Sequence, residues 1–144
     1  MFRRSISEVL LAHRDSHQAV EAFLTTGHDF CVDVRAVGDQ WFSGEVSGAY
    51  PCGVVIGFRA IVAIELNPAL ANFPPPGAPP PSPSLTQMLD SLARLSKTVV
   101  LYTSGSHWVG RLREVGHDYV ELVSPHGKSS FYLQSSLQWI RVTG

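Results

Sequence analysis

The sequence predicts a mainly β protein with α-helices, organised as two tandem small five-stranded antiparallel barrels, each preceded by one N-terminal α-helix. Three observations predict this fold class. A proline-rich segment divides the 144 residues, the same order of helix and strand signals occurs on both sides of it, and glycine turns separate short alternating runs. We therefore expect helix-plus-barrel units at 5–66 and 84–144, joined by a linker over 67–83.

The linker is the clearest boundary in the chain. Eight of the ten prolines lie between Asn67 and Ser84. Proline has no backbone N–H and favours extended polyproline II, so this segment neither pairs into a sheet nor continues a helix. We interpret it as a spacer; the alternative is that PPPGAPPP is a ligand for an aromatic groove.

Each unit begins with a predicted amphipathic helix. In the first unit Ser5 and Glu8 form a capping-box signature, and an apolar stripe at helical spacing follows until Gly27 ends it. The members of that stripe are Ile6, Leu10, His13, His17, Val20 and Leu24. In the second unit Ser84 and Gln87 form the capping box. The second stripe consists of Leu85, Met88, Leu89, Leu92 and Leu95.

Short β-strands are predicted after each helix. Downstream of the second helix the strand signals are TVVLYT, HWVGRLREV, DYVELVS, SSFYLQ and LQWIRV. Downstream of the first they are FCVDVRAV, QWFSGEVSG, GVVIGF and IVAIEL. The stretch from Trp41 to Gly44 matches the stretch from Trp108 to Gly110, which indicates an internal repeat of about 67 residues, too long for a solenoid. A glycine within the second strand of each unit suits the sharp bend of a small barrel.

The second unit resembles the Sm-like fold and, within it, Hfq. The shared pattern is a short apolar helix, a strand, a turn ending at Gly105, a glycine at Gly110, a turn with Asp118, then YVELV and two last strands joined by a short step. The resemblance covers 84–142 and, more weakly, 16–66, while PRC-type and Src-homology-type barrels share much of the pattern. It implies subunits that pair open edge strands. We therefore expect the two repeats to pair as a pseudo-dimer, and chains to associate further through strand edges or the His13/His17 helix face.

The chain departs from Hfq at the RNA-binding step. Hfq carries a Lys-His pair between its last two strands, where this chain has Gln134 and Ser135. The first unit offers only Arg59 at the corresponding step, and neither unit has the Arg-Gly pair common in Sm proteins. The RNA-binding chemistry that the resemblance implies is therefore expected to be mostly absent.

Composition and motifs exclude several function classes. The net charge is −1, so no overall field attracts polyanions or acidic membranes. Two cysteines without a CxxC pair, and no apolar run of signal-peptide or membrane-span length, predict a soluble cytoplasmic protein. Asp29 and Asp33 lie on one predicted strand, but no nucleophile elbow, P-loop or dinucleotide fingerprint accompanies them. We expect neither enzymatic activity nor a cofactor.

One group of side chains is a candidate nucleic-acid surface: Arg111, Arg113, Lys128, Tyr132 and Arg141, with Tyr119 and Trp139 near them in sequence. Such surfaces stack bases on aromatic rings while cations follow the phosphates. The alternative is ordinary solvent-facing charge on strands, because acidic residues are interleaved with these cations. Those residues are Glu114, Asp118 and Glu121.

His13 and His17 are weak candidates for a metal site. Their spacing places them on one helix face, but no third ligand is evident in the sequence. We expect them to pack against a barrel mouth or a partner subunit. Trp41, Trp108 and Trp139 are likewise expected to be packing residues.

Two functions remain after these exclusions. The expected one is a non-catalytic scaffold that forms homo-oligomers or binds a protein partner. The alternative is binding of RNA or single-stranded nucleic acid through the basic and aromatic side chains of the second unit.

Overall fold

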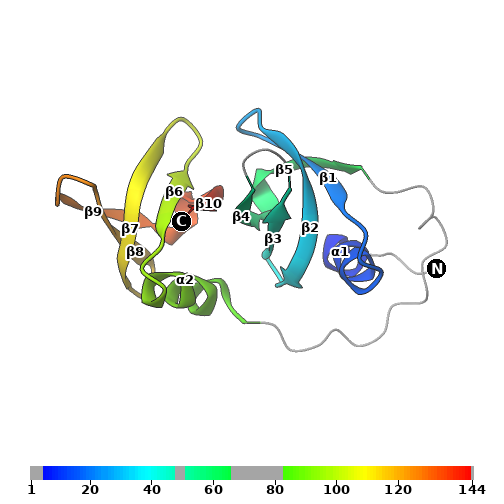
Figure 1. Ribbon diagram of the computed structural model, residues 1–144, viewed down its shortest axis with the longest axis horizontal. Helices are drawn as coiled ribbons and strands as arrows, with labels where there is room; N and C mark the ends of the chain where they lie inside the picture. Colours follow the sequence, from blue (N-terminus) through cyan, green and yellow to red (C-terminus); the bar gives the residue numbers. More distant parts are fainter. Residues whose placement is uncertain (1–4, 48–50, 66–82, 144) are drawn as a thin grey trace.

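The computed structural model describes residues 5–47, 51–65 and 83–143 (Figure 1). The first half of the described chain consists of α1 (Ile6–Asp15), β1 (Val20–Leu24), β2 (Asp29–Val37), β3 (Trp41–Val46), β4 (Cys52–Gly57), the 3-10 turn η1 (Phe58–Ala60) and β5 (Ile61–Glu65). The second half consists of α2 (Leu85–Arg94), β6 (Thr98–Tyr102), β7 (His107–Val115), β8 (Tyr119–Val123), β9 (Ser129–Leu133), the 3-10 turn η3 (Gln134–Ser136) and β10 (Trp139–Thr143). The predicted linker lies, except for its last residue, outside the described residues.

All strands of the described chain belong to one antiparallel sheet. The strand order is β5-β1-β2-β3-β4-β10-β6-β7-β8-β9. Two separate closed barrels are therefore not confirmed: the sheet is continuous and open, with β5 at one end and β9 at the other. The reason is that β4 pairs with β10 of the other half instead of with β5 of its own. Figure 1 shows the two groups of strands meeting at β4 and β10.

The sheet carries two hydrophobic cores on opposite faces. Successive side chains of a strand point to opposite faces, and along β4 the residues alternate between the cores. Val54 and Ile56 belong to the core of the first half, which we call core 1, and Val55 belongs to the core of the second half, core 2. Helix α1 packs against β2, and α2 packs against β7.

The first helix is shorter than the sequence predicts. It ends at Asp15, and His17 has a φ of 55°, a left-handed conformation that stops a helix. Val20 and Leu24 therefore lie on β1, a strand that the sequence analysis missed. The error has a simple cause, because a spacing of four residues returns to the same face of a helix and of a strand alike.

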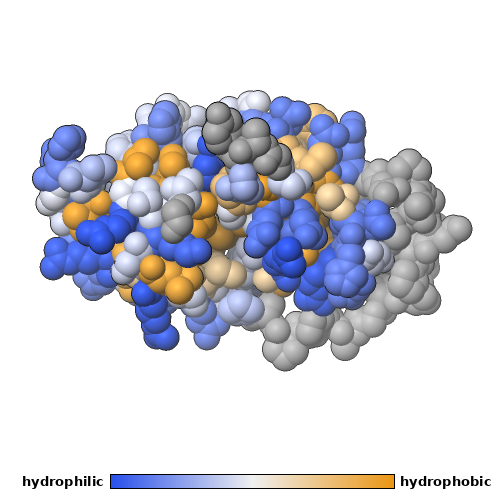
Figure 2. Space-filling view, in the orientation of Figure 1, coloured by the Kyte–Doolittle hydropathy of each residue, from blue (hydrophilic) through white to orange (hydrophobic). Residues whose placement is uncertain are grey.

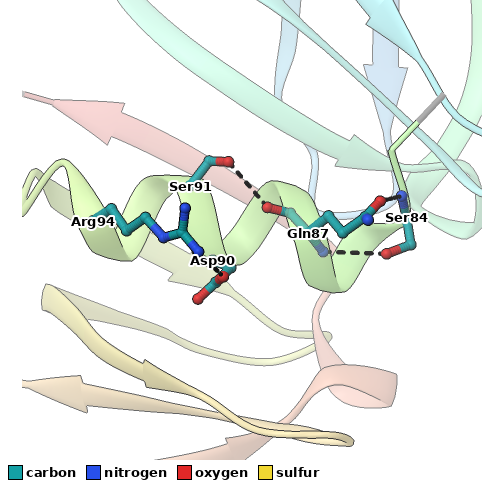
Figure 3. Close-up of polar contacts among 5 residues, drawn as sticks. All are labelled: Ser84, Gln87, Asp90, Ser91 and Arg94. Carbon is teal, nitrogen blue, oxygen red and sulfur yellow. Dashed lines mark hydrogen bonds and ion pairs between the residues drawn. The ribbon is translucent and has the colours of Figure 1, made fainter.

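The second helix and the strands of the second half are confirmed. Helix α2 begins at a complete capping box: the Ser84 hydroxyl accepts from the Gln87 backbone N–H at 3.2 Å, and the Gln87 side chain accepts from the Ser84 N–H at 2.8 Å (Figure 3). These two bonds satisfy N–H groups that have no partner within the helix. Five strands follow, each within about two residues of its sequence signal.

Candidate functional site

The two halves meet along a seam where β4 pairs with β10. Arg59, in η1, fastens this seam by donating from Nε and Nη2 to the Leu137 carbonyl at 3.2 and 2.6 Å, and from Nη2 to the Gln134 carbonyl at 3.1 Å. Hydrogen bonds that involve a charged donor are stronger than neutral ones. Within the described chain the two halves are therefore joined by the pairing of β4 with β10 into one open sheet. Arg59, the one arginine at the step between the last two strands of the first half, is thus hydrogen-bonded to its own chain.

Each half places one tryptophan in the other half's core. Trp41, from β3, is fully buried in core 2, and Trp139, from β10, is buried in core 1. The Trp139 ring stacks on Tyr102, with centroids 4.0 Å apart, and contacts Phe30 edge-on at 5.3 Å. Large rings supply much of the buried area in small cores, so neither core is complete without the other half.

A polar relay closes one end of the seam. Trp139 Nε1 donates to Thr26 Oγ1 at 3.0 Å, and that hydroxyl lies 2.9 Å from His28 Nδ1. The direction of this second hydrogen bond depends on which ring nitrogen of His28 carries the proton, because a hydroxyl can donate one hydrogen bond and accept two. Burial, the Arg141 charge and the nearby His107 together lower the pKa of His28 below its ordinary value of 6.5.

Matching irregularities define which residues of the two halves are equivalent. Each half has a β-bulge in its second strand, at Arg35 and at Arg113. The turn that follows each bulge is closed by a glycine N–H, from Gly38 to the Trp41 carbonyl and from Gly116 to the Tyr119 carbonyl. The structural counterpart of Trp41 is therefore Tyr119, and the predicted match to Trp108 is wrong.

Each half has a glycine at the close contact between its second and third strands, but the two glycines lie on different strands of that contact. Gly44 lies on the third strand of the first half, and Gly110 on the second strand of the second half. A Cβ at Gly44 would meet the Asp33 carbonyl oxygen, and a Cβ at Gly110 would meet the Val123 carbonyl oxygen. Each half therefore needs one glycine where its second and third strands cross closely, but on opposite partners.

Strands β5 and β9 each have one neighbour among the described strands, and both carry exposed apolar side chains. Phe131 and Leu133 are exposed on β9, and Val62 is exposed on β5. Figure 2 shows hydrophobic surface, in orange, over the second half. An apolar strand with unpaired backbone groups is a template for pairing with another strand.

Phe131 has a counterpart inside the molecule. Ladder positions place Tyr132 opposite Val120 and Ile56 opposite Phe42, so Phe131 on β9 corresponds to Val55 on β4. Phe131 is 63% exposed and Val55 is 4% exposed, because the second half covers Val55. Strand β9 therefore occupies in the second half the position that β4 occupies in the first. The second half covers β4 at the seam, whereas no described strand covers the free edge of β9.

The predicted nucleic-acid surface is divided between the two faces of the sheet. Arg141 lies on the face of Trp139, and the ladder from Arg141 through Val100 to Val109 places Arg111 on that face too. Tyr132 packs against core 2, on the opposite face. Lys128 lies beside Tyr132 in the lining of one small cavity. The five residues thus do not form one surface.

Two of the predicted nucleic-acid-binding arginines, Arg113 and Arg141, interact with side chains of their own chain. Arg113 forms an ion pair with Glu121 at 3.8 Å. The Arg141 guanidinium lies 5.5 Å from the Trp139 ring centroid and 6.0 Å from that of Tyr102, within cation–π range. At the far end of the second half Tyr119 donates to Glu114 at 2.9 Å, and this bond is the main cause that raises the pKa of Tyr119.

His13 and His17 do not lie on one face of a helix, as the sequence analysis expected. His13 is buried within α1, where its Nδ1 lies 2.9 Å from the Val9 carbonyl oxygen, whereas His17 is exposed beyond the helix end. The expected shared face is lost because α1 ends before His17. Among the described residues no three histidine, cysteine or acidic side chains cluster as a metal site would require. Neither described helix has the length and apolar composition needed to cross a membrane.

The sequence analysis expected the two repeats to pair but did not identify the residues of the seam. Arg59, His28 and Trp139 meet there, although they come from both halves and have no motif in common. No protein-family model matches the chain, and neither the curated proteins nor the solved structures contain one with significant similarity to it.

Proposed function

We propose that the protein is a non-catalytic scaffold that assembles by adding strands at the free edges of its sheet, with further copies of itself as partners. The observation that carries the proposal is the contrast between Val55, which the second half covers at the seam, and its exposed counterpart Phe131. An uncovered apolar edge is a liability that proteins usually avoid with charges, proline or covering segments. Strand β9 (SSFYL) and the glutamine that follows it carry no charge and no proline.

The seam specifies how a second copy would be added. Its ladder places Trp139 opposite Ile56 and Ile140 opposite Val55. The counterparts of Trp139 and Ile140 are Ala63 and Ile64, because Ile64 lies opposite Ala22 as Ile140 lies opposite Leu101. We therefore expect β5 of one copy to pair with β9 of the next, with Ile64 opposite Phe131. The two edges differ, so the contact is head-to-tail and generates rings or filaments.

The proposal includes the resemblance to Sm-like proteins, whose subunits pair open edge strands into rings. The pairing of β4 with β10 is a contact of this kind inside one chain. Association between chains should be weaker than the seam, because Ala63 replaces Trp139 and Ser135 stands where the first half has Arg59. Assembly is therefore expected to depend on protein concentration.

Light scattering across a concentration series tests this proposal. We expect the mean mass of the wild type to rise with concentration, and Phe131→Asp to keep the protein monomeric, because a charge on an edge strand opposes pairing. Leu95→Asp is the matched control, since Leu95 is 61% exposed but follows α2, away from the edges. A wild type that remains monomeric at tens of micromolar would refute self-assembly.

A second candidate, binding of single-stranded nucleic acid, is favoured by one observation. Arg111 and Arg141 share a face with Tyr102 and His107, and no acidic residue of β6, β7 or β10 projects from that face between them. Two phosphate contacts predict a slope of log affinity on log salt of about −1.4 for single strands. Fluorescence anisotropy with labelled oligo-U and oligo-A tests it. Arg111→Ala should weaken both alike, whereas Lys128→Ala, on the opposite face, should change neither.

A further inference from the structure

The second half contains a small open slot beside β9. Its volume is about 220 Å³, and it is lined by Trp108, Val109, Leu122, Ser124, Lys128, Ser130 and Tyr132. The rings of Trp108 and Tyr132 form its aromatic wall, with centroids 4.8 Å apart and planes inclined by 45°. Trp108 is 37% exposed, far more than the other two tryptophans. Aromatic side chains left accessible in a concave site are typical of binding surfaces.

The first half shows what lies at the corresponding position when a strand has been added to the edge. The bulges and ladders make Phe30 the counterpart of Trp108, and Ile56 the counterpart of Tyr132. The Trp139 ring, which β10 brings when it pairs with β4, contacts Phe30 edge-on and belongs to the same core as Ile56, its ladder partner. The pairing of β10 with β4 thus shows how an added strand can place one large aromatic ring at this position.

We propose that the slot binds a large aromatic side chain of an extended segment from a different protein, which adds to β9 as a new strand. This inference rests on the proposed role of β9 as an interaction edge. It goes beyond self-assembly because a second copy brings only Ala63 to this position and leaves the slot unfilled. A segment with tryptophan there has the larger apolar contact and displaces the weaker partner.

The slot also specifies the charge of its partner. In the first half, the position that corresponds to Lys128 is Cys52, two residues before Val54, which lies opposite Arg141. Lys128 thus introduces a positive charge where the seam has none. The position two residues after the aromatic residue of the added strand lies opposite Ser130, next to Lys128 on the same face. An acidic residue is favoured at that position.

A peptide based on β10 tests the inference directly. The probe is a fluorescently labelled LQWIEVT, which is the chain's own 137–143 sequence with glutamate at the position of Arg141. Anisotropy should show binding to the full-length protein. The matched peptide LQAIEVT should bind at least about tenfold more weakly, because loss of about 1.4 kcal/mol of aromatic contact is a factor of ten. The peptide LQWIRVT should bind more weakly than LQWIEVT.

Two variants locate the binding site. Trp108→Ala should abolish binding, and circular dichroism checks that the variant is folded. Lys128→Glu, at an exposed position, should reverse the preference, so that LQWIRVT binds better than LQWIEVT. Equal binding of LQWIEVT and LQAIEVT, absence of binding, or an unchanged preference in Lys128→Glu would each overturn the inference.

The outcome is separable from that of the proposed function. A protein that self-associates but binds no peptide keeps its role as a scaffold and loses the aromatic slot. A protein that stays monomeric alone, yet binds LQWIEVT with the stated dependence on tryptophan and Lys128, keeps the slot and loses self-assembly.

Discussion

At the scale of single residues, the exchanged tryptophans are the side chains on which both cores depend. Trp139 is buried in core 1, although it comes from the last strand of the other half. We expect Trp139→Ala to lower the free energy of unfolding by about 3–5 kcal/mol, because it removes a fully buried ring and leaves a cavity. Urea titration followed by circular dichroism measures the change.

Trp108→Ala is the matched control for this prediction, because Trp108 is partly exposed and belongs to neither core. Its cost should be smaller than that of Trp139→Ala, because Trp108 is 37% exposed and Trp139 is almost completely buried. Trp139→Phe keeps a ring but removes the N–H that donates to Thr26, so it should fall between the two. Equal costs for Trp139→Ala and Trp108→Ala would contradict the exchanged-tryptophan arrangement.

We expect His28 to make the stability of the protein depend on pH. Its folded-state pKa lies below 6.5, mainly because of burial and then because of Arg141 and His107. The unfolded chain then binds more protons than the folded protein between the lowered pKa and 6.5, so stability is lost as the pH falls through this window. Above 6.5 both states are neutral at this site and the full stability is present.

The test compares the pH dependence of unfolding for the wild type and His28→Gln. Glutamine does not titrate, so the variant should lose less stability than the wild type between pH 7.5 and pH 5, values chosen to bracket the ordinary histidine pKa of about 6.5. Taking the difference between the two proteins cancels the contribution of the other histidines. If the free energy of unfolding has the same pH dependence in both proteins, titration of His28 does not contribute to stability.

At the scale of elements, the close crossing of β7 and β8 leaves no room for one additional methyl group. A Cβ at Gly110 would collide with the backbone carbonyl of Val123, which cannot move without opening the ladder. We expect Gly110→Ala to destabilise the protein by about 1–3 kcal/mol, the usual cost of overpacking. Gly105→Ala is the control, because no atom lies within 4 Å of its added Cβ. Thermal unfolding of both variants decides the prediction.

The strands of the second half could be predicted because glycine turns bound each alternating run. In the first half Val20 and Leu24 fit a helix and a strand equally well, and only the left-handed turn at His17 decides between them. The repeat was aligned wrongly because Gly44 and Gly110 look equivalent in sequence. They lie on opposite partners of the same crossing, which only the strand pairing reveals.

The binding residues could be predicted less well, for a related reason. The sequence supplies the alternation along each strand but not the face of the sheet on which two distant strands place their side chains. Arg141 and Tyr132 are near each other in sequence and lie on opposite faces. The slot at Trp108 was hidden for the same reason, because it is recognised only by comparison with the ring that fills its counterpart.

At the scale of the whole molecule, each half contributes side chains to the core of the other. Core 2 contains Trp41 and Val55 from the first half, and core 1 contains Trp139 from the second. The seam adds a four-residue ladder between β10 and β4, and on its other side β10 pairs over five residues with β6 of its own half. Opening either half therefore exposes a ring that belongs to the core of its neighbour.

We therefore expect a single unfolding transition in which both halves lose structure together. Native-state hydrogen exchange should report the same opening free energy for amides of β2 and of β7, since neither core survives loss of the other half. A fragment of residues 84–144 should be unfolded or aggregated, because it lacks Trp41 to fill core 2 and leaves Trp139 without core 1. The contrary result would be two separated transitions, or a fragment with cooperative unfolding and native-like circular dichroism. Either would mean that the halves are independent domains and that the exchanged tryptophans contribute little to either core.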